Sequence, residues 1–356
     1  MFFPGQGSQK VGMLAPLLES FRHIVTPMLE QLDHTLPPAD GQPKLSTVIA
    51  QGPAGTLTAT ENAQPAIMFT SLVILRILEK EFGLSPRLQT DFFLGHSLGE
   101  FTALVAAGVL KLEDALLLVR KRGEVMRDCA IRASVPEMEG GPGETGMRAL
   151  IVEKQFLPGL IRSVNEFMAS ETLPNDEFLS IANINSSDQI VLSGHLKAIN
   201  AAICHIRKFA GHDPRSLPLR VSAPFHSMIM APAVPVVRKM LDGMDINWPP
   251  QQGGDAKAVV CNVTARVYES KERLRELLSK QCTATVRWAD SVNYLDYEEG
   301  VTRWIAIGPS KVAKNLVRRE IRGGEDRIVG IEGHNARNIE EAVKLLRKME
   351  EREKED

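Results

Sequence analysis

The sequence has little net charge, no paired cysteines and no long apolar run. Its 356 residues carry a formal net charge of −2, which argues against a general attraction to nucleic acid or anionic membranes. No apolar run approaches the roughly 20 residues that span a bilayer, and no segment resembles a signal peptide. We therefore expect a soluble protein that binds neither nucleic acid nor membrane.

Cysteine is also scarce. The four cysteines lie far apart and form no CxxC pair, a pattern typical of a reducing compartment and not of a zinc site. They are Cys129, Cys204, Cys261 and Cys282. We expect all of them to be free thiols, and we expect no bound metal.

Strand-like apolar runs alternate with helical patterns, which favours an α/β sheet. The pattern predicts a strand at Thr90–Gly95, then helices from about Leu98 to Ala107 and at Glu113–Ala130. Residues 133–146 are acidic and rich in glycine and proline, so we expect a linker or exposed insertion, and a domain boundary, at this point. The length alone fits an inserted lobe as well as two tandem domains.

Beyond residue 146 the pattern predicts a second, smaller unit. Its expected strand, helix, two strands, helix and strand are Met147–Val152, Glu153–Glu171, Phe178–Asn183, Gln189–Ser193, Leu196–Ala210 and Ser216–Val221. This β-α-β-β-α-β order is ferredoxin-like. An α/β pattern then resumes, with strands at Ala258–Val263 and Val301–Gly308. We expect an α/β-hydrolase-like large subdomain with a parallel sheet (1–143 and 222–356) and an inserted ferredoxin-like small subdomain (144–221).

The segment Gly95-His96-Ser97-Leu98-Gly99 follows the apolar run Phe92-Phe93-Leu94 and opens a helical segment. Small residues on both sides let a sharp strand-to-helix turn close and expose the Ser97 hydroxyl as a nucleophile. The start of the helix directs N–H groups toward an oxyanion, with the Leu98 N–H as the first donor. The alternative is a glycine-rich turn in which Ser97 caps the helix. Adjacent side chains diverge on such a turn, so we expect His96 to pack beside it and not to act as the base.

Arg122 lies on the apolar stripe of the next predicted helix. The stripe consists of Leu112, Ala115, Val119, Met126 and Cys129. A buried guanidinium needs an anion, because an unpaired buried charge costs several kcal/mol. Two partners remain open: an internal Asp or Glu in a structural salt bridge, or a substrate carboxylate, which the planar guanidinium binds in bidentate fashion.

His226 differs in setting from most of the eight histidines. It follows the last predicted strand of the small unit, in Ser222-Ala223-Pro224-Phe225-His226-Ser227, where the chain returns toward the large subdomain. This position makes it a candidate base.

Taken together, these segments resemble the malonyl-CoA:acyl-carrier-protein transacylases of the mitochondrial or bacterial type, nearly from end to end. The motifs that carry the resemblance are Phe3-Pro4-Gly5-Gln6-Gly7-Ser8-Gln9, Gly95-His96-Ser97-Leu98-Gly99-Glu100, Arg122-Gly123, Asn183 with Asn185, Ser193-Gly194, Phe225-His226-Ser227, Gln281 and Gly308-Pro309. The resemblance implies an acyltransferase of fatty acid synthesis that moves malonyl from malonyl-CoA to the phosphopantetheine thiol of acyl carrier protein. It implies no cofactor beyond these substrates.

The resemblance also implies a catalytic role for three residues. Ser97 is the nucleophile, His226 is its general base and acid, and Arg122 binds the malonyl carboxylate. Malonyl would rest on Ser97 as an ester between two half-reactions, which predicts ping-pong kinetics.

Four further positions match the family and are expected to shape the site. Gln6 and Leu98 would supply the oxyanion N–H groups. Gln281 would orient the site near the histidine in place of a carboxylate, which makes a dyad and not a triad. Phe225 would leave little space for an α-methyl branch, although a pocket discriminates one methyl group by only about 1–3 kcal/mol.

Two rival functions use the same features. One is a serine thioesterase or other hydrolase built on the same turn, and the other is a non-catalytic carrier-binding module.

A GxGxxG match at Gly141-Pro142-Gly143-Glu144-Thr145-Gly146 lies among acidic residues and precedes a predicted strand, so we do not expect a phosphate site there.

We expect a monomer whose partners are malonyl-CoA, CoA and holo acyl carrier protein. Basic residues recur along one face of the helix after Gly308-Pro309, which makes this face a candidate dock for an acidic carrier protein, with a solvated helix face as the alternative. They are Lys311, Lys314, Arg318 and Arg322. The first predicted strand starts at or before Met1, so we expect the natural sequence to begin earlier. We expect the missing part to include a targeting peptide that is removed, and on this ground we expect the protein to be located in the mitochondrial matrix, with the cytoplasm as the alternative location.

Overall fold

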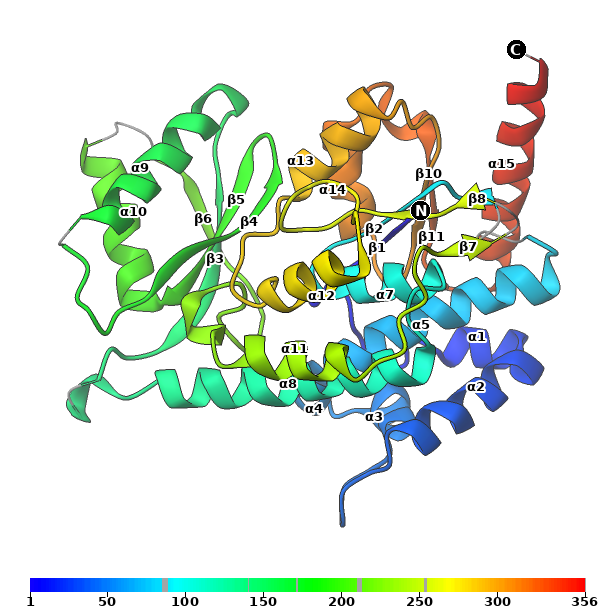
Figure 1. Ribbon diagram of the computed structural model, residues 1–356, viewed down its shortest axis with the longest axis horizontal. Coiled ribbons are helices and arrows are strands. Elements are labelled where there is room, and N and C mark those ends of the chain that lie inside the picture. The colour runs from blue at the N-terminus through cyan, green and yellow to red at the C-terminus, as the bar shows by residue number, and fades with distance from the viewer. Residues whose placement is uncertain (85–88, 140, 171, 210–212, 253–254, 356) are drawn as a thin grey trace.

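The computed structural model has a larger α/β body and a smaller lobe, which lie side by side in Figure 1. The structure describes residues 1–84, 89–139, 141–170, 172–209, 213–252 and 255–355. The long helix α8 (Leu112–Ala133) runs along the body and leads into the lobe. The candidate site residues all lie in the body, and the lobe contributes residues such as Asn183 and Asn185 to the wall of the pocket beside them.

The body is built on a five-stranded parallel sheet with the strand order β11-β10-β1-β2-β9. The strands are β1 (Phe2–Phe3), β2 (Phe92–Gly95), β9 (Ala258–Val259), β10 (Trp304–Ile307) and β11 (Ile328–Ile331). Both faces are covered, as is usual for parallel sheets: Phe2 packs into one apolar cluster and Phe3 into another, and both are fully buried. Phe3 pairs with Gly95, so β1 and β2 end at the same edge of the sheet.

Helices surround this sheet. They are α1 (Ala15–Ser20), α2 (Arg22–Thr35), α3 (Leu45–Gln51), α4 (Ala54–Thr58), α5 (Thr60–Glu81), α7 (Leu98–Ala106), α8, α11 (Ala233–Asp242), α12 (Lys271–Lys280), α13 (Trp288–Asn293), α14 (Val312–Glu320) and α15 (Ala336–Glu355). Helices α5 and α8 approach closely at Gly123, where an added Cβ would lie 2.5 Å from the Cα of Glu61. This contact brings the side chains of Gln64 on α5 and Arg122 on α8 together.

The lobe has the ferredoxin-like order that the sequence predicts. Its antiparallel sheet runs β4-β5-β3-β6. In chain order the elements are β3 (Thr145–Ile151), α9 (Leu157–Ala169), β4 (Leu179–Ser186), β5 (Gln189–His195), α10 (Leu196–Phe209) and β6 (Arg215–Pro218). The lobe has its own apolar cluster and joins the body at β4, where the Ile184 N–H donates to the Val286 carbonyl at 3.0 Å. The expected subdomain limits at 144–221 stay a prediction.

Several expected strands end earlier than the apolar runs suggest. Strand β9 stops at Val259, because a tight turn follows in which the Ala265 N–H donates to the Cys261 carbonyl at 2.8 Å. Strand β6 stops at Pro218, and residues 219–221 line a pocket instead. After β9 the apolar run continues because Val260 and Cys261 are still fully buried, whereas Leu219 after β6 is 37% exposed.

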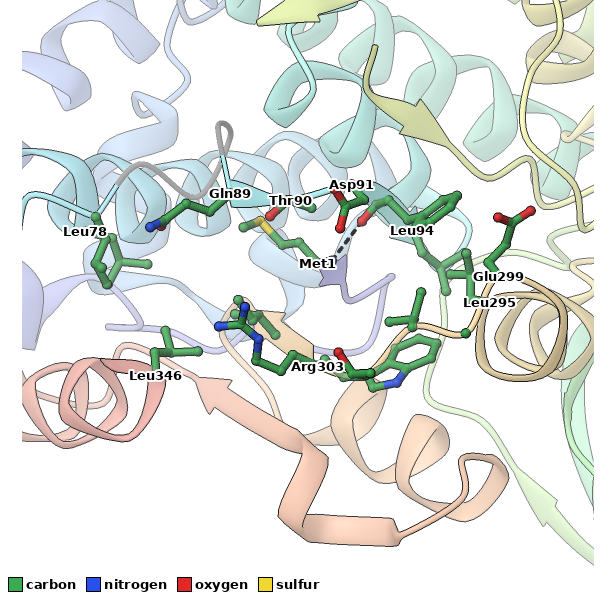
Figure 2. A pocket seen from close by; sticks show the side chains of 17 residues that line it. Met1, Leu78, Gln89, Thr90, Asp91, Leu94, Leu295, Glu299, Arg303 and Leu346 are labelled. Atoms are coloured by element: carbon green, nitrogen blue, oxygen red, sulfur yellow. Dashed lines mark hydrogen bonds between the residues drawn. The ribbon is translucent and has the colours of Figure 1, made fainter. Parts of the chain in front are cut away.

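The chain begins with a buried amine beside β2. The Met1 amine donates to the Phe92 carbonyl at 2.8 Å. It lies beside a pocket of about 190 Å³, and Figure 2 shows the side chains that line this pocket. Burial lowers the pKa of this amine to about 5. This pocket shares no lining residue with the pocket at Ser97.

Three sequence expectations concern cysteines, membrane-spanning segments and metal sites. All four cysteines are free thiols; Cys129, Cys261 and Cys282 are buried and Cys204 is exposed. In the described part of the chain, no helix combines the length and apolarity that a membrane crossing requires. Over the same residues, no three His, Cys, Asp or Glu side chains gather as a metal-binding group.

Candidate active site

Ser97 lies on the sharp turn between β2 and α7 that the sequence predicts. The turn needs glycine on both sides: a Cβ on Gly95 would lie 1.9 Å from the Gly99 carbonyl carbon, and one on Gly99 would lie 2.4 Å from the Phe3 oxygen. Ser97 itself has a φ of 52°, a left-handed conformation that costs a non-glycine residue about 1–3 kcal/mol. Strain at a predicted nucleophile supports the nucleophile over the capping alternative, and the Ser97 side chain makes no capping bond to α7.

The Ser97 hydroxyl contacts the imidazole of His226. Ser97 Oγ lies 2.6 Å from His226 Nε2. On the other side of the ring, Nδ1 lies 2.8 Å from the Gln281 carbonyl oxygen and 3.1 Å from that of Ala284. Both partners are acceptors, so Nδ1 must carry the proton and Nε2 is left free to accept one. The pair is a dyad backed by carbonyls.

His226 is held as a neutral base. It is 2% exposed and has a φ of 57°. Burial, and then the positive charge of Arg122, lower the pKa of His226 to about 3. The imidazole is therefore unprotonated near pH 7, as a general base must be.

His96, next to the nucleophile, points elsewhere, as expected. Its Nε2 lies 2.9 Å from Asn185 Oδ1 on β4, and its ring packs against Trp288 with 5.1 Å between ring centroids. The side chain therefore ties the serine turn to the lobe.

Arg122 is buried, at 1% exposed, and its partners are neutral. Nη1 donates to Gln64 Oε1 at 2.7 Å and Nη2 to Gln281 Oε1 at 3.0 Å, while Nε–H has no hydrogen-bond partner. The guanidinium carbon lies 5.2 Å from the centre of the Phe101 ring. Within the described ranges, no carboxylate forms an ion pair with Arg122, so the direct structural salt bridge is not seen there. The binding of a substrate carboxylate by Arg122 stays a prediction.

Gln281 connects these groups. Its backbone carbonyl faces His226, and its side-chain Nε2 donates to the Ser97 carbonyl at 2.9 Å and to Glu100 Oε2 at 2.5 Å. Its Oε1 accepts from Arg122. The single residue thus sets the positions of base, nucleophile turn and guanidinium.

Three neighbours of the site were not predicted from the sequence: Gln64, Glu100 and Asn262. Asn262 Oδ1 accepts from the Ser97 N–H at 2.7 Å, and its Nδ2 donates to the Gly95 carbonyl at 2.7 Å. A signal for it exists, since Asn262 follows the apolar run Ala258–Cys261 directly, and polar residues after parallel strands lie at the functional edge of a sheet. Glu100 and Gln64 carry no comparable local signal.

A pocket of about 390 Å³ opens at Ser97 and is bounded by both parts of the protein. Its lining includes Gln6, Ser97, Phe225 and His226, and Arg122 is not among its lining residues. Leu98 is buried at the first position of α7, so its N–H is one of the amides without an acceptor inside the helix.

Helix α14 borders the same pocket through Val312, Ala313 and Leu316. Of the four basic residues predicted for one helix face, Lys314 and Arg318 lie on α14, whereas Lys311 precedes the helix and Arg322 follows it. The charges of this group are partly neutralised. Ion pairs join Lys311 to Glu332 at 3.7 Å, Arg318 to Glu325 at 3.3 Å and Arg322 to Asp296 at 3.1 Å. Carrier docking on this face stays a prediction.

Known proteins resemble the chain over nearly its whole length. The acyl transferase domain family matches residues 1–253. A malonyl CoA-acyl carrier protein transacylase from Bacillus subtilis (strain 168) is 37% identical over 346 residues, covering 97% of this chain and 96% of that protein.

Solved structures agree with this. The malonyl CoA-acyl carrier protein transacylase from Coxiella burnetii is 30% identical over 97% of this chain and 96% of its own, with a TM-score of 0.79. A chain from a complex of a type II PKS acyl-carrier protein with its malonyl-transacylase has the same TM-score, 0.79, at 29% identity over 97% of this chain and 98% of its own. The resemblance drawn from the sequence motifs is confirmed: the protein belongs to the acyl transferase domain family, among the malonyl CoA-acyl carrier protein transacylases.

Proposed function

We propose that this protein transfers malonyl from malonyl-CoA to the phosphopantetheine thiol of acyl carrier protein through an ester on Ser97. The observation that carries the proposal is the 2.6 Å contact between Ser97 Oγ and a neutral His226, with Arg122 buried close by and free of any carboxylate partner in the described chain. Nucleophile, base and anion receptor are then present in one site.

In the first half-reaction, His226 Nε2 takes the Ser97 proton while Oγ attacks the thioester carbonyl. The N–H groups of Gln6 and Leu98 are proposed to stabilise the oxyanion, with the start of α7 adding its dipole. The carbon–sulfur bond then breaks, and the CoA sulfur takes the proton from His226. Serine and histidine supply the nucleophile and base, so the step needs no metal or further cofactor.

In the second half-reaction, the carrier thiol gives its proton to His226 and its sulfur attacks the carbonyl carbon of the Ser97 ester. The bond between that carbon and Ser97 Oγ then breaks, and Oγ takes the proton back from His226. The carbonyls of Gln281 and Ala284 hold the ring in the tautomer that both steps need. A holo acyl carrier protein is the acceptor by analogy with the solved transacylase that is in complex with its acyl-carrier protein.

Arg122 is proposed to select the acyl group. Its Nε–H is free, and its two Nη groups bond neutral amides, which a charged carboxylate can replace with a stronger, charge-assisted bond. Phe225, buried on the pocket wall, is proposed to limit branching next to the thioester.

The location of the protein in the mitochondrial matrix, with the cytoplasm as the alternative, stays a prediction from the sequence.

The test is the mass of the intact protein after brief exposure to malonyl-CoA, beside acetyl-CoA. We expect a malonyl adduct that is absent in Ser97→Ala and selectively weakened in Arg122→Ala. Rapid CoA release without an adduct would instead indicate the hydrolase, and no reaction at all would indicate a non-catalytic module.

A further inference from the structure

The proposed mechanism leaves one buried acid unused. Glu100, on the first turn of α7, is fully buried and lies directly behind the serine turn. Its Oε1 accepts from the Tyr268 hydroxyl at 2.5 Å and from the Asn262 N–H at 3.1 Å, and its Oε2 accepts from Gln281 Nε2 at 2.5 Å. A carboxylate is seldom buried without a cation beside it, so this acid requires an explanation.

Glu100 and Arg122 lie on opposite sides of one amide. Gln281 donates its Nε2 to Glu100 and accepts from Arg122 Nη2 at its Oε1, at 3.0 Å. Within the described chain, neither Glu100 nor Arg122 belongs to an ion pair, yet the two charges interact across the amide. Because both side chains are buried, this interaction is screened less than one at the surface. Glu100 is therefore the internal counter-charge of Arg122.

A substrate carboxylate on Arg122 would bring a second negative charge into this site. Two carboxylates that share one cation in a dry environment cannot both stay ionised at low cost, and one of them takes a proton. The substrate carboxylate would contact the guanidinium directly, whereas Glu100 reaches it only through Gln281. Glu100 is consequently the group that becomes neutral.

We propose that Glu100 takes up one proton when an acyl carboxylate binds Arg122 and releases it when that acyl group leaves. The inference rests on the proposed malonyl transfer. Glu100 acts here as a positioning and charge-compensating residue, since it touches Gln281 and not the substrate. An acyl group without a carboxylate, such as acetyl, would cause no proton uptake.

The groups around Glu100 leave it free to titrate alone near neutral pH. Burial raises its pKa to about 7, against smaller opposing effects from its hydrogen-bond donors and Arg122. Burial also raises the pKa of Cys261 to about 11 and that of Tyr268 well above its usual value, while it lowers the pKa of His226 to about 3. Cys282, beside Arg122, has a raised pKa and stays a neutral thiol.

The test is the equilibrium between malonyl-CoA plus enzyme and malonyl-enzyme plus CoA, followed by intact mass from pH 6 to 8 at a constant ratio of malonyl-CoA to CoA. Proton uptake makes the equilibrium constant fall as the pH rises. The fall is about tenfold over this range if the pKa of Glu100 is about 7 in the free enzyme and at least two units higher in the malonyl-enzyme. In weak buffer near pH 7, about half a proton per adduct should be taken up.

Two variants sharpen the result. Glu100→Gln cannot titrate, so its equilibrium constant should stay level over this pH range. Tyr268→Phe removes a hydrogen-bond donor that favours the ionised form of Glu100, so the pKa of Glu100 should rise. The equilibrium constant should therefore begin to fall at a higher pH than in the wild type. If Glu100→Gln does not fold, the wild-type proton uptake and the Tyr268→Phe shift still decide the question.

The outcomes separate the two proposals. A malonyl adduct on Ser97 with a level equilibrium constant and no proton uptake would overturn the role of Glu100 and leave malonyl transfer standing. The absence of any adduct between pH 6 and 8 would overturn both.

Discussion

Replacing Asn262 by Ala should both destabilise the protein and slow acylation of Ser97. The side chain is fully buried and holds the serine turn by two bonds, from the Ser97 N–H and to the Gly95 carbonyl, each at 2.7 Å. Alanine leaves both backbone groups buried without a partner, and each costs about 1–3 kcal/mol. We expect a loss of about 2–5 kcal/mol in the free energy of unfolding, measured by urea denaturation.

The same change should act on the rate because Ser97 is held in a strained conformation. Without the Asn262 acceptor, the positive φ of 52° can relax and the 2.6 Å contact with His226 lengthens. We expect the single-turnover release of CoA to slow by about 10–100-fold, since small misplacements of a nucleophile have effects of this size. The KM for malonyl-CoA should change little.

Asn247→Ala is the matched control. Asn247 also donates its amide to a glycine carbonyl, that of Gly108 at 3.0 Å, but it is exposed and does not line the pocket at Ser97. Its loss should cost less than about 1 kcal/mol and leave acylation unchanged. If Asn262→Ala were as stable and as fast as Asn247→Ala, the serine turn would not depend on Asn262, and the reasoning would be wrong.

Three further predictions follow from the site and its supports. The low pKa of His226, about 3, keeps the base neutral in acid, so kcat/KM should hold from pH 7 down to about pH 5; a fall centred near the usual histidine value of about 6.5 would contradict this. Gly123→Ala places a Cβ 2.5 Å from Glu61 Cα and should destabilise by about 1–3 kcal/mol in thermal unfolding, whereas Gly159→Ala on α9 meets nothing within 4 Å and should be neutral or stabilising. Phe225→Ala should raise the ratio of methylmalonyl to malonyl transfer by about tenfold or more in competition assays, and an unchanged ratio would remove Phe225 from acyl selection.

Local patterns in the sequence predict most of the fold. The alternation of strands and helices, the β-α-β-β-α-β order of the lobe and the Gly95–Gly99 turn depend on residues close together in the chain, which periodicity and small-residue requirements can identify. The turn is the clearest case. A Cβ on Gly95 would overlap the backbone of Gly99, and a Cβ on Gly99 would overlap the backbone of Phe3, so both positions require glycine. Strand ends were less accurate, as at β9, since burial extends past the hydrogen-bonded residues.

The pattern of residues along α8 placed Arg122 on a buried face, but it could not identify the partner. The outcome depends on Gln64, which is 58 residues away, and on Gln281, which is 159 residues away. Gln64 carries no local signal, because glutamine is ordinarily exposed and only the approach of α5 to α8 buries it. Gln281 was expected near the histidine from the family resemblance alone, and not as a partner of Arg122. Without those contacts a salt bridge and a substrate site remained equally open.

The sequence by itself therefore determined the chemistry that is available: a serine on a strained turn, a histidine after the lobe and an arginine on an apolar stripe. Tertiary structure decided how these groups are charged and held. Asn262 lies 165 residues from Ser97, and the Gln281 carbonyl 55 residues from His226. Contacts over such separations arise only when the sheet and helices pack, and burial in that packed interior, not any local motif, makes His226 neutral and leaves Arg122 without a carboxylate.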